Sequence, residues 1–414
     1  MTQQPDVLII GAGPSGLAAA VALRRSGVER VLVVDRESQA GGVPRHCNHT
    51  GFGLRDVRRV LTGPDYARRN VQLAEAAGVE ILTNTMVTEW RGATGVRTTR
   101  PSGVLDIQAA AIVLATGCRE RPRSARLVPG ARPAGIFTTG ALQQWVYLQR
   151  HPVGKRAVIV GAEHVSFSAV MTLKHAGLDV IAMLTDLPRH QSFLAYKLIG
   201  ADRWRVPLLT NTRMSAILGK QRVEGVEIAD VNTGAKRILD CDTVVFTGDW
   251  IPDHELARSG NLTMDSPSRS PQVDSLLRTS VPGVFAAGNL LHAADTADLA
   301  ALSGRYVAES VVNYLQTQIW RDTDLIPITF DSAVRWVSPH VIQPDNEALP
   351  NHHLSLRVAV PLEKSTIEIW QGKQRLWARR YRRLTPNLPV YLPDTFLKEM
   401  RTAEAIRIII RPSI

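Results

Sequence analysis

Three glycines near the start of the chain have the spacing of a loop that binds phosphate groups. Gly11 permits a tight turn, Gly13 lets a diphosphate approach the backbone, and Gly16 lets a helix pack closely on a strand. Pro14 and Ser15 complete the loop. The free N–H groups and the positive dipole end of the following helix attract the phosphates. The segment therefore predicts a dinucleotide-binding site.

The elements that such a loop requires stand on both sides of it. Residues 6–10 form an apolar run that predicts a strand, residues 17–27 predict a helix, and residues 31–35 predict a second strand. Asp35 closes the second strand, where a carboxylate accepts hydrogen bonds from the hydroxyls of an adenosine ribose. Together with Arg36, which follows it, Asp35 joins the expected cofactor-binding residues.

Two further segments favour FAD as the dinucleotide. Gly41 and Gly42 follow the second strand, and such a pair lets the chain and a diphosphate approach each other. Arg45 lies close behind, where it can hold a carboxylate or a flavin phosphate. The other segment, residues 283–289, resembles the flavoprotein motif that ends in Gly-Asp and binds the ribityl chain.

In this last segment an asparagine stands where flavoproteins have aspartate. Gly288 keeps its place, and the amide of Asn289 accepts a hydrogen bond from a ribityl hydroxyl and can also donate one. A helix is predicted to begin near Thr296 and Ala297. Its N-terminus should face the N1/C2 region of the flavin, where the positive dipole end stabilises the anionic reduced form.

Other expected cofactor contacts come from the edge of the same predicted sheet. Residues 109–115 form an apolar strand that ends in Thr116 and Gly117. Because parallel strands present their carboxyl ends at one edge of a sheet, Ala115, Thr116 and Gly117 should lie beside the phosphate loop. Val87 completes the expected set.

The strand, turn and helix of the first loop recur roughly 150 residues later. The second copy keeps the first glycine, Gly161, but has Glu163 in the second position and Ser166 in the third. Two like charges 4 Å apart repel by about 4 kcal/mol at an effective dielectric near 20, or about a thousandfold in affinity. The sequence therefore predicts a vestigial nicotinamide site, in which Glu163 occupies the place of the phosphate.

The alternative is that the second loop still binds NAD(P)H. In that case the Glu163 side chain swings into solvent. Arg189 and His190, which lie beyond the next predicted strand, would then meet a 2′-phosphate.

The alternation of strands and helices predicts an α/β fold with mostly parallel sheets. We expect a discontinuous Rossmann-like FAD domain over residues 1–120 and 245–320, with a second Rossmann-like, NAD(P)-type domain inserted over residues 121–244. Prolines then punctuate short β-like runs, which predicts a small, mostly β C-terminal module over residues 321–414.

Histidines supply the candidates for proton transfer. His46 and His49 follow the glycine pair, and His292 follows the second flavin segment. A neutral imidazole near a flavin can take the one proton that amine oxidation releases. The alternative is that these groups only form hydrogen bonds with the cofactor and one another.

Three isolated cysteines, Cys47, Cys118 and Cys241, form no CxxC pair. This argues against a zinc site and a redox-active disulfide, and it favours a reducing cytoplasm. No apolar run is long enough to cross a membrane, and no signal peptide is predicted.

The chain has 49 Lys and Arg against 38 Asp and Glu, a net charge of +11. We interpret this charge as a general surface property and expect no nucleic-acid partner. The alternative is a docking face for a membrane or a partner subunit. The arginines over residues 119–126 are expected to lie in a solvated linker at the crossover into the second domain, and the alternative is an interface with another subunit.

With these motifs in place, residues 1–320 resemble the two-dinucleotide-domain flavoproteins of the pyridine nucleotide-disulfide oxidoreductase superfamily. Residues 41–53, 61–67, 161–166 and 246–256 are more specific. They resemble the FAD subunits of hydrogen cyanide synthase, opine oxidases and dye-linked amino-acid dehydrogenases.

The resemblance implies a FAD-dependent subunit that oxidises an amino acid, opine or related amine. Electrons would pass to another redox subunit or a quinone, with possible peripheral contact to a membrane. Two alternatives stay open: an NAD(P)H-dependent FAD reductase, and a flavoprotein with a structural or assembly role.

Overall fold

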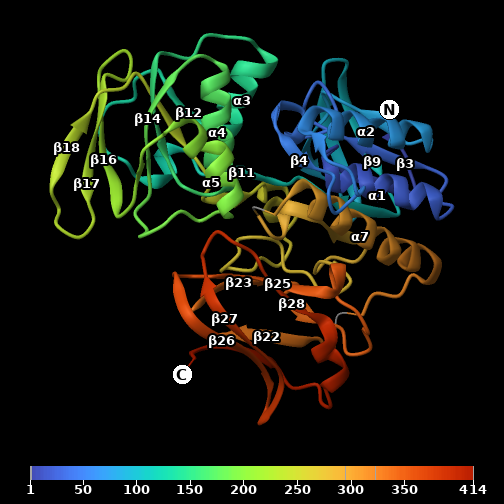
Figure 1. Ribbon diagram of the computed structural model, residues 1–414. Helices are drawn as coiled ribbons and strands as arrows, with labels where there is room; N and C mark the ends of the chain where they lie inside the picture. The colour runs from blue at the N-terminus through green and yellow to red at the C-terminus, as the bar shows by residue number, and fades with distance from the viewer. Residues whose placement is uncertain (1, 294, 322, 414) are drawn as a thin grey trace.

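The computed structural model describes residues 2–293, 295–321 and 323–413. Three parts are visible in Figure 1: a blue α/β unit, a green α/β unit and an orange to red β-rich module. The two parallel sheets and the β-rich end of the chain confirm the predicted fold class. We keep the domain bounds given above as proposals; the boundary between residues 244 and 245 falls inside a strand, β19 (Thr243–Phe246).

The first parallel sheet positions the predicted phosphate loop. Its strands lie in the order β21-β10-β2-β3-β6. Its three central strands are buried on both faces, which explains their uninterrupted apolar sequences. The strands are β2 (Val7–Ile10), β3 (Val31–Val34), β6 (Glu80–Leu82), β10 (Ala111–Leu114) and β21 (Val284–Ala286).

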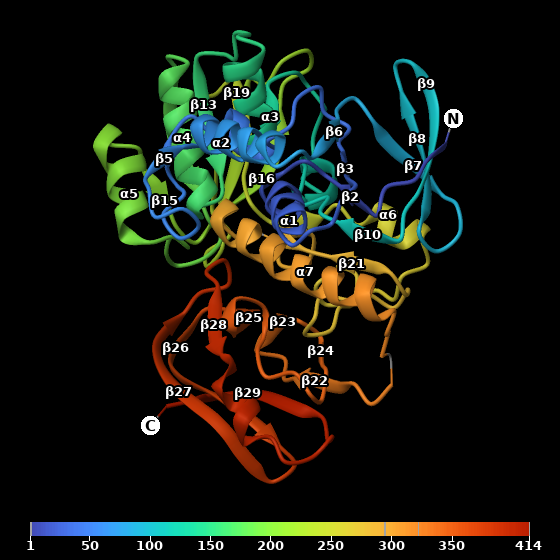
Figure 2. The same cartoon turned by 90° about the vertical axis from the view of Figure 1, so that its right-hand side faces the viewer.

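Three helices pack against this sheet or around it: α1 (Pro14–Arg25), α2 (Gly63–Ala76) and α7 (Ala297–Thr317). Figures 1 and 2 both show α7 between the first sheet and the C-terminal module. A smaller sheet has the order β1-β9-β8-β7. Its strands are β1 (Thr2–Gln3), β7 (Met86–Trp90), β8 (Gly95–Arg100) and β9 (Gly103–Gln108). The short strands β4 (Thr50–Phe52) and β5 (Leu61–Thr62) pair with each other, and α2 follows β5 directly in the chain.

The second parallel sheet repeats the plan of the first, in the order β12-β19-β13-β14-β15. Its other strands are β12 (Ile136–Thr138), β13 (Arg156–Val160), β14 (Asp179–Leu184) and β15 (Leu208–Leu209). The helices are α3 (Thr139–Gln143), α4 (His164–His175) and α5 (Leu194–Gly200). An antiparallel sheet of β16 (Thr212–Leu218), β17 (Gly225–Asp230) and β18 (Lys236–Leu239) completes this part.

The two connections between the parallel sheets pair with each other as antiparallel strands, β11 (Cys118–Glu120) and β20 (Trp250–Pro252). Arg119 forms ion pairs with Asp253 and with Glu255 at the start of α6 (Glu255–Ser259). Arg121 lies 3.0 Å from Asp249. The expectation of a solvated linker was therefore wrong, because carboxylates of the return connection hold these arginines.

The C-terminal module has its own apolar core between two sheets. One has the order β24-β22-β29-β26-β27 and the other β23-β25-β28. The strands are β22 (Ile326–Phe330), β23 (Val334–Ser338), β24 (Val341–Ile342), β25 (His353–Val358), β26 (Leu362–Gln371), β27 (Gln374–Leu384), β28 (Val390–Pro393) and β29 (Ile406–Pro412).

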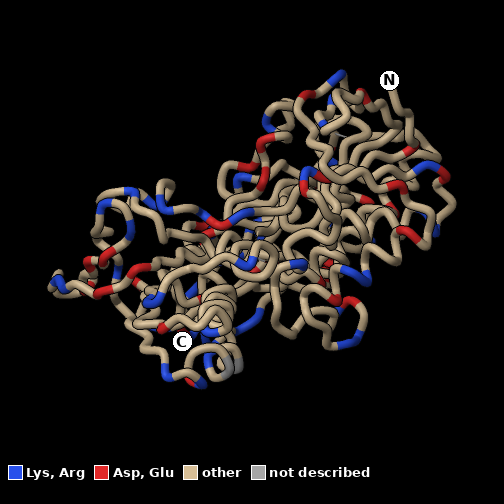
Figure 3. Tube along the Cα trace, turned by 90° about the horizontal axis from the view of Figure 1, so that it is seen from above, with Lys and Arg blue, Asp and Glu red and all other residues tan. Residues whose placement is uncertain are grey.

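Charged residues of both signs are interspersed along the trace in Figure 3. This agrees with our interpretation of the net charge as a general surface property. Within the part of the chain that the structure describes, no helix combines the length and the apolar character that crossing a bilayer demands.

Candidate cofactor and active site

The phosphate loop lies between β2 and α1, as predicted. Gly13 is the N-cap residue of α1, and no side chain caps the helix. A β-carbon added to Gly13 would meet no other atom of the described residues within 4 Å, whereas one added to Gly16 would collide with the Gly11 carbonyl oxygen. Gly16 is therefore required by packing. Packing does not require glycine at position 13, and the space beside Gly13 is open.

The glycine pair packs on this loop. Gly42 has φ +64°, in the left-handed region that favours glycine. A β-carbon there would lie 2.8 Å from the Cα of Gly13. The Gly41 N–H donates to the Ala12 carbonyl at 2.8 Å. The two segments that were predicted to approach one diphosphate are thus in direct contact.

Asp35 ties the end of β3 to the same loop. Its carboxylate accepts hydrogen bonds from the Ala12 N–H at 2.6 Å and the Glu37 N–H at 2.8 Å. Carboxylate oxygens have about four lone-pair sites, so acceptor capacity for ribose hydroxyls is left. Arg36 instead forms an ion pair with Asp253 at 3.1 Å, and Arg45 lies 3.4 Å from Glu37. Cofactor binding by these two arginines stays a prediction.

The second flavin segment reaches the loop from β21. A β-carbon on Gly288 would lie 2.6 Å from the Cβ of Ser15, so the two turns touch. Asn289 donates from Nδ2 to the Asp295 carbonyl at 3.0 Å, but its Oδ1 is buried without a partner. The Ser15 hydroxyl is buried and unpartnered as well. Buried polar atoms normally find hydrogen-bond partners, so these two oxygens fit a polar ligand such as FAD.

The remaining expected contacts surround the same edge. The Ala115 N–H donates to the Ile10 carbonyl at 2.9 Å. Thr116 donates from its hydroxyl to the Asp253 carbonyl at 2.8 Å, and the Gly117 carbonyl accepts from the Asp253 N–H at 2.9 Å. Thr296 is the N-cap of α7 and Ala297 is its first residue. Val87 is half-buried on β7 and packs against the core of the first unit.

The histidines differ in their surroundings. His46 ends a 3₁₀ turn over Val43–His46, is 3% exposed, and has an Nδ1 without a partner. Burial lowers the pKa of His46 to about 4, with a further contribution from the charge of Arg45. Burial also lowers the pKa of His49, whose Nδ1 lies 2.9 Å from the Thr50 carbonyl oxygen. His46 is therefore neutral at pH 7, and its unpartnered Nδ1 can bond to a ligand, although the lowered pKa makes it a weak base.

Acidification should destabilise the protein through His46. The folded-state pKa lies below the unfolded value of 6.5, so only the unfolded state gains this proton between pH 6.5 and pH 4. At pH 5 the loss is about 2 kcal/mol. The His46→Asn variant should therefore lose less of its melting temperature between pH 7.5 and pH 5 than the wild type. His151→Asn, at an exposed position, serves as the control; an unchanged pH dependence in His46→Asn would refute this account.

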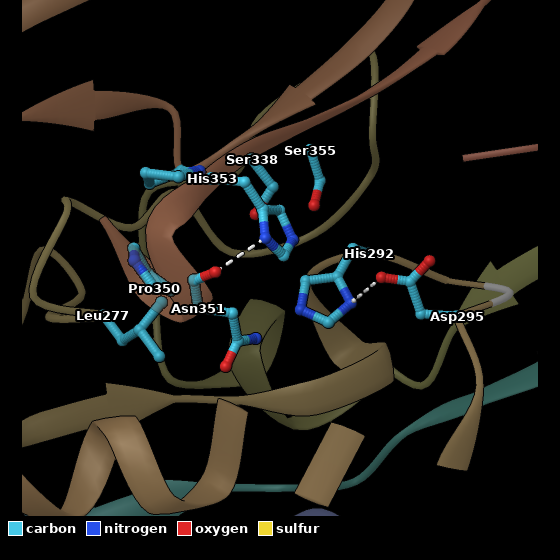
Figure 4. A pocket seen from close by; sticks show the side chains of 9 residues that line it. Leu277, His292, Asp295, Ser338, Pro350, Asn351, His353 and Ser355 are labelled. Carbon is cyan, nitrogen blue, oxygen red and sulfur yellow. Dashed lines mark hydrogen bonds and ion pairs between the residues drawn. The ribbon is translucent and has the colours of Figure 1, made fainter. Parts of the chain in front are cut away.

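His292 faces the C-terminal module. Its Nδ1 lies 3.1 Å from Asp295, and its ring lines a small polar pocket with His353 and Ser355 of β25 (Figure 4). The role of the three histidines as flavin-side candidates stays a prediction.

A buried ion pair that sequence reasoning missed holds the C-terminal module. Asp295 accepts from Arg357 on β25 at 2.9 Å and from the Tyr391 hydroxyl on β28 at 3.3 Å. Both partners in the ion pair are almost fully buried. Arg357, His292 and the hydrogen bonds hold the pKa of Asp295 well below its usual range, against the opposing effect of burial. This carboxylate lies directly before the N-cap of α7.

The second loop is closed by its own side chain. Glu163 is the N-cap of α4, the position that Gly13 holds on α1. Its carboxyl group accepts from the Ala162 N–H at 2.8 Å and from the Thr247 hydroxyl at 3.0 Å, and Ser166 completes a capping box. Glu163 is only 7% exposed, so the alternative in which it swings into solvent was wrong.

A second buried carboxyl group lies beside it, without any signal in the sequence. Glu120 accepts from the Gly140 N–H at 2.7 Å and the Gly248 N–H at 3.3 Å. Burial raises the pKa of Glu120 to about 7, with a smaller contribution from Glu163, and burial also raises the pKa of Glu163. Arg189, proposed for a 2′-phosphate, pairs instead with Glu363 at 3.2 Å.

No disulfide is present among the described residues, which include all three cysteines. Cys47 is buried, and its thiol donates to the Val43 carbonyl at 3.4 Å. Burial, with the charge of Glu120, raises the pKa of Cys47 to about 12. Cys47 therefore stays a thiol at neutral pH, which excludes it as a nucleophile.

Comparisons with known proteins agree with this geometry. The family model described as pyridine nucleotide-disulphide oxidoreductase matches residues 5–304. An opine oxidase subunit from Agrobacterium tumefaciens (strain Ach5) is 29% identical over 334 residues, which cover 73% of this chain and 64% of that protein. Ferredoxin–NADP reductase from Ignicoccus hospitalis is 26% identical over 328 residues, which cover 76% of this chain and 99% of that protein.

A solved structure shows the same fold. The thioredoxin reductase of T. acidophilum superposes with a TM-score of 0.63 at 23% identity, over 75% of this chain and 98% of that chain. The family match ends before the C-terminal module. The chain is a FAD-dependent oxidoreductase that belongs to the pyridine nucleotide-disulphide oxidoreductase family.

Proposed function

We propose that the chain is the FAD subunit of an enzyme that oxidises an amino acid, an opine or a related amine. Its electrons would pass to a partner subunit or a quinone rather than to NAD(P)+. The buried position of Glu163 in the second loop carries this proposal.

Glu163 competes with a nicotinamide dinucleotide in two ways. Its carboxyl group takes the N–H groups at the start of α4 that a diphosphate would otherwise use. Its side chain also fills the space at the N-cap, where Gly13 of the first loop leaves the space open. The steric block persists whether Glu163 is ionised or neutral. Pyridine nucleotides are therefore poor partners for this flavoprotein.

Oxidation of an amine suits the groups that the structure offers. When bound, FAD supplies a two-electron acceptor for the hydride on the carbon next to the amine nitrogen. The proton on nitrogen then has to leave, and a neutral imidazole can accept it. The unpartnered Nδ1 of His46 supports this role by its geometry, while burial lowers the pKa of His46 and makes it a weak base. Because Cys47 is buried as a thiol and no disulfide is present among the described residues, disulfide reduction is disfavoured.

The names of two relatives support an enzyme built from several chains. The opine oxidase relative and a sarcosine oxidase relative from Rhizobium meliloti (strain 1021) are both named as subunits. The matched region of this chain covers 64% of the opine oxidase subunit and 30% of the sarcosine oxidase subunit. Both relatives therefore contain further residues outside the match. We infer that a second protein completes the path of the electrons here.

Anaerobic mixing tests the proposal. The oxidised holoenzyme is mixed with a panel of amino acids, opines and simple amines, and separately with NADH and NADPH, while the flavin absorbance is followed. We expect bleaching by at least one amine and none by either pyridine nucleotide. Rapid bleaching by NADPH or NADH would instead favour a reductase, as the match to ferredoxin–NADP reductase suggests.

Opening the second loop should restore affinity for pyridine nucleotides. The Glu163→Gly variant removes both the carboxyl group and the side chain from the N-cap of α4, so NADH should bind tighter by about tenfold or more. Ser166→Ala is the matched control, because it breaks the same capping box and leaves Glu163 in place. Titration calorimetry with NADH measures both. Equal affinities in the wild type and Glu163→Gly would show that Glu163 does not block the site.

A further inference from the structure

A pocket opens where the C-terminal module meets the rest of the chain. The space inside it, traced by the centre of a water-sized sphere, is about 40 Å³, which is room for a few water molecules or one carboxylate group. Its walls come from the return connection after β19, from the loop before α7, and from β23 and β25 of the C-terminal module. Among its lining residues are Trp250, Arg269, Leu291, Arg335, Trp336 and Arg357.

Within the described ranges, two guanidinium groups in this pocket make no hydrogen-bonded ion pair with a carboxylate. Arg269 is half-buried, and its guanidinium makes no ion pair with any described residue. Arg335 lies 3.6 Å from Asp249, which is beyond hydrogen-bond length. Asp249 already accepts from Arg121 at 3.0 Å. The pocket therefore has an excess of positive charge, with donors available for an anion.

The third guanidinium is fixed in place and shapes the pocket. Arg357 is 3% exposed and is held by Asp295, and its guanidinium stacks 5.1 Å from the centre of the Trp336 ring. The indoles of Trp250 and Trp336, with the buried side chain of Leu291, add apolar surface. A ligand that fits these walls places an anionic group inside the pocket.

We infer that this pocket binds the carboxylate end of a small organic acid, with Arg269 and Arg335 as its ligands. Guanidinium groups bind carboxylates through paired, charge-assisted hydrogen bonds. If the chain oxidises amines as proposed above, the inference narrows the substrate to amines that carry a carboxylate. The C-terminal module, which lies outside the family match, then contributes Arg335 to this binding site.

Carboxylates without an oxidisable C–N bond report ligand binding alone, because the flavin cannot oxidise them as amines. Benzoate and pyruvate are titrated into the oxidised holoenzyme by calorimetry, beside the neutral amides benzamide and pyruvamide. We expect each carboxylate to bind at least tenfold tighter than its amide. Equal binding of the pairs, or no binding of any carboxylate, overturns the inference.

Single substitutions identify the residues. Arg335→Met and Arg269→Met should each weaken carboxylate binding by about tenfold, and Arg335→Lys should retain part of it. Arg213→Met, at an exposed arginine on β16 away from the pocket, should change nothing. Flavin content and melting temperature report that each variant is folded. Wild-type affinity in both folded methionine variants would reject the assignment.

The outcomes for the pocket and for the proposed function are distinct. If carboxylate binding depends on Arg269 and Arg335 but no amine bleaches the flavin, the inference about the pocket is supported and amine oxidation is rejected. Bleaching by an amine that is unaffected in both methionine variants would keep the proposed function and reject the pocket.

Discussion

Replacing Gly13 by glutamate should remove FAD from the protein and leave the chain folded. The substitution copies into the first loop what Glu163 does in the second, since both residues are the N-cap of the helix that follows. A side chain at Gly13 enters open space, so the polypeptide has room for it. A carboxylate placed about 4 Å from a phosphate costs about 4 kcal/mol, or about a thousandfold in affinity.

The measurement is the ratio of flavin to protein absorbance after purification, followed by titration with FAD. Gly13→Ala serves as the matched control and should retain much more flavin, because it adds no charge. Gly16→Ala should behave differently from both and destabilise the fold, since its β-carbon would collide with the Gly11 carbonyl oxygen. Full FAD occupancy in Gly13→Glu would contradict the assignment of the diphosphate to this loop.

The second large effect is expected from Arg357→Met. Removing one partner of a buried ion pair leaves an uncompensated charge and typically costs about 3–5 kcal/mol. Here the Asp295 carboxylate would lose its guanidinium partner while staying buried beside His292 and Tyr391. The contact between α7 and the C-terminal module should therefore weaken, and thermal unfolding should begin at a lower temperature.

A double-mutant cycle tests this explanation. Asp295→Asn combined with Arg357→Met removes both charges, so it should recover part of the stability that Arg357→Met alone loses. Arg335→Met, at a more exposed arginine on the neighbouring strand β23, should have a small effect on stability. A double variant that is no more stable than Arg357→Met would show that the unpaired charge is not the cause.

Local patterns in the sequence were sufficient for the fold and for the phosphate loop. The apolar runs that became β2, β3 and β10 are fully buried strands, and such runs identify themselves without knowledge of their neighbours. Glu163 was equally visible, because its position relative to Gly161 defines it as an N-cap. In these cases the physical cause lies within a few residues of the chain.

The rest of the site depends on contacts between distant segments. Asp295 and Arg357 are 62 positions apart, and neither position carries a local signal that they meet. Glu120 belongs to a crossover that looks like a solvated linker, and only the pairing of β11 with β20 and the packing of α3 bury it. His292 was chosen for its closeness in sequence to a flavin motif, and nothing near it in the sequence indicates that its ring lines a pocket with His353 and Ser355 of the C-terminal module.

The duplicated loops differ in what satisfies the start of their helices. Helix α4 is capped by its own Glu163 and Ser166, so its first turn is complete in the bare polypeptide. No side chain caps helix α1, so the backbone N–H groups of its first turn can donate to a bound anion. The melting temperature of the first unit should consequently rise with the concentration of free FAD. The melting temperature of the second unit should not depend on that concentration. One duplicated architecture thus contains a half whose stability depends on the concentration of its cofactor and a half whose helix is capped by its own side chain.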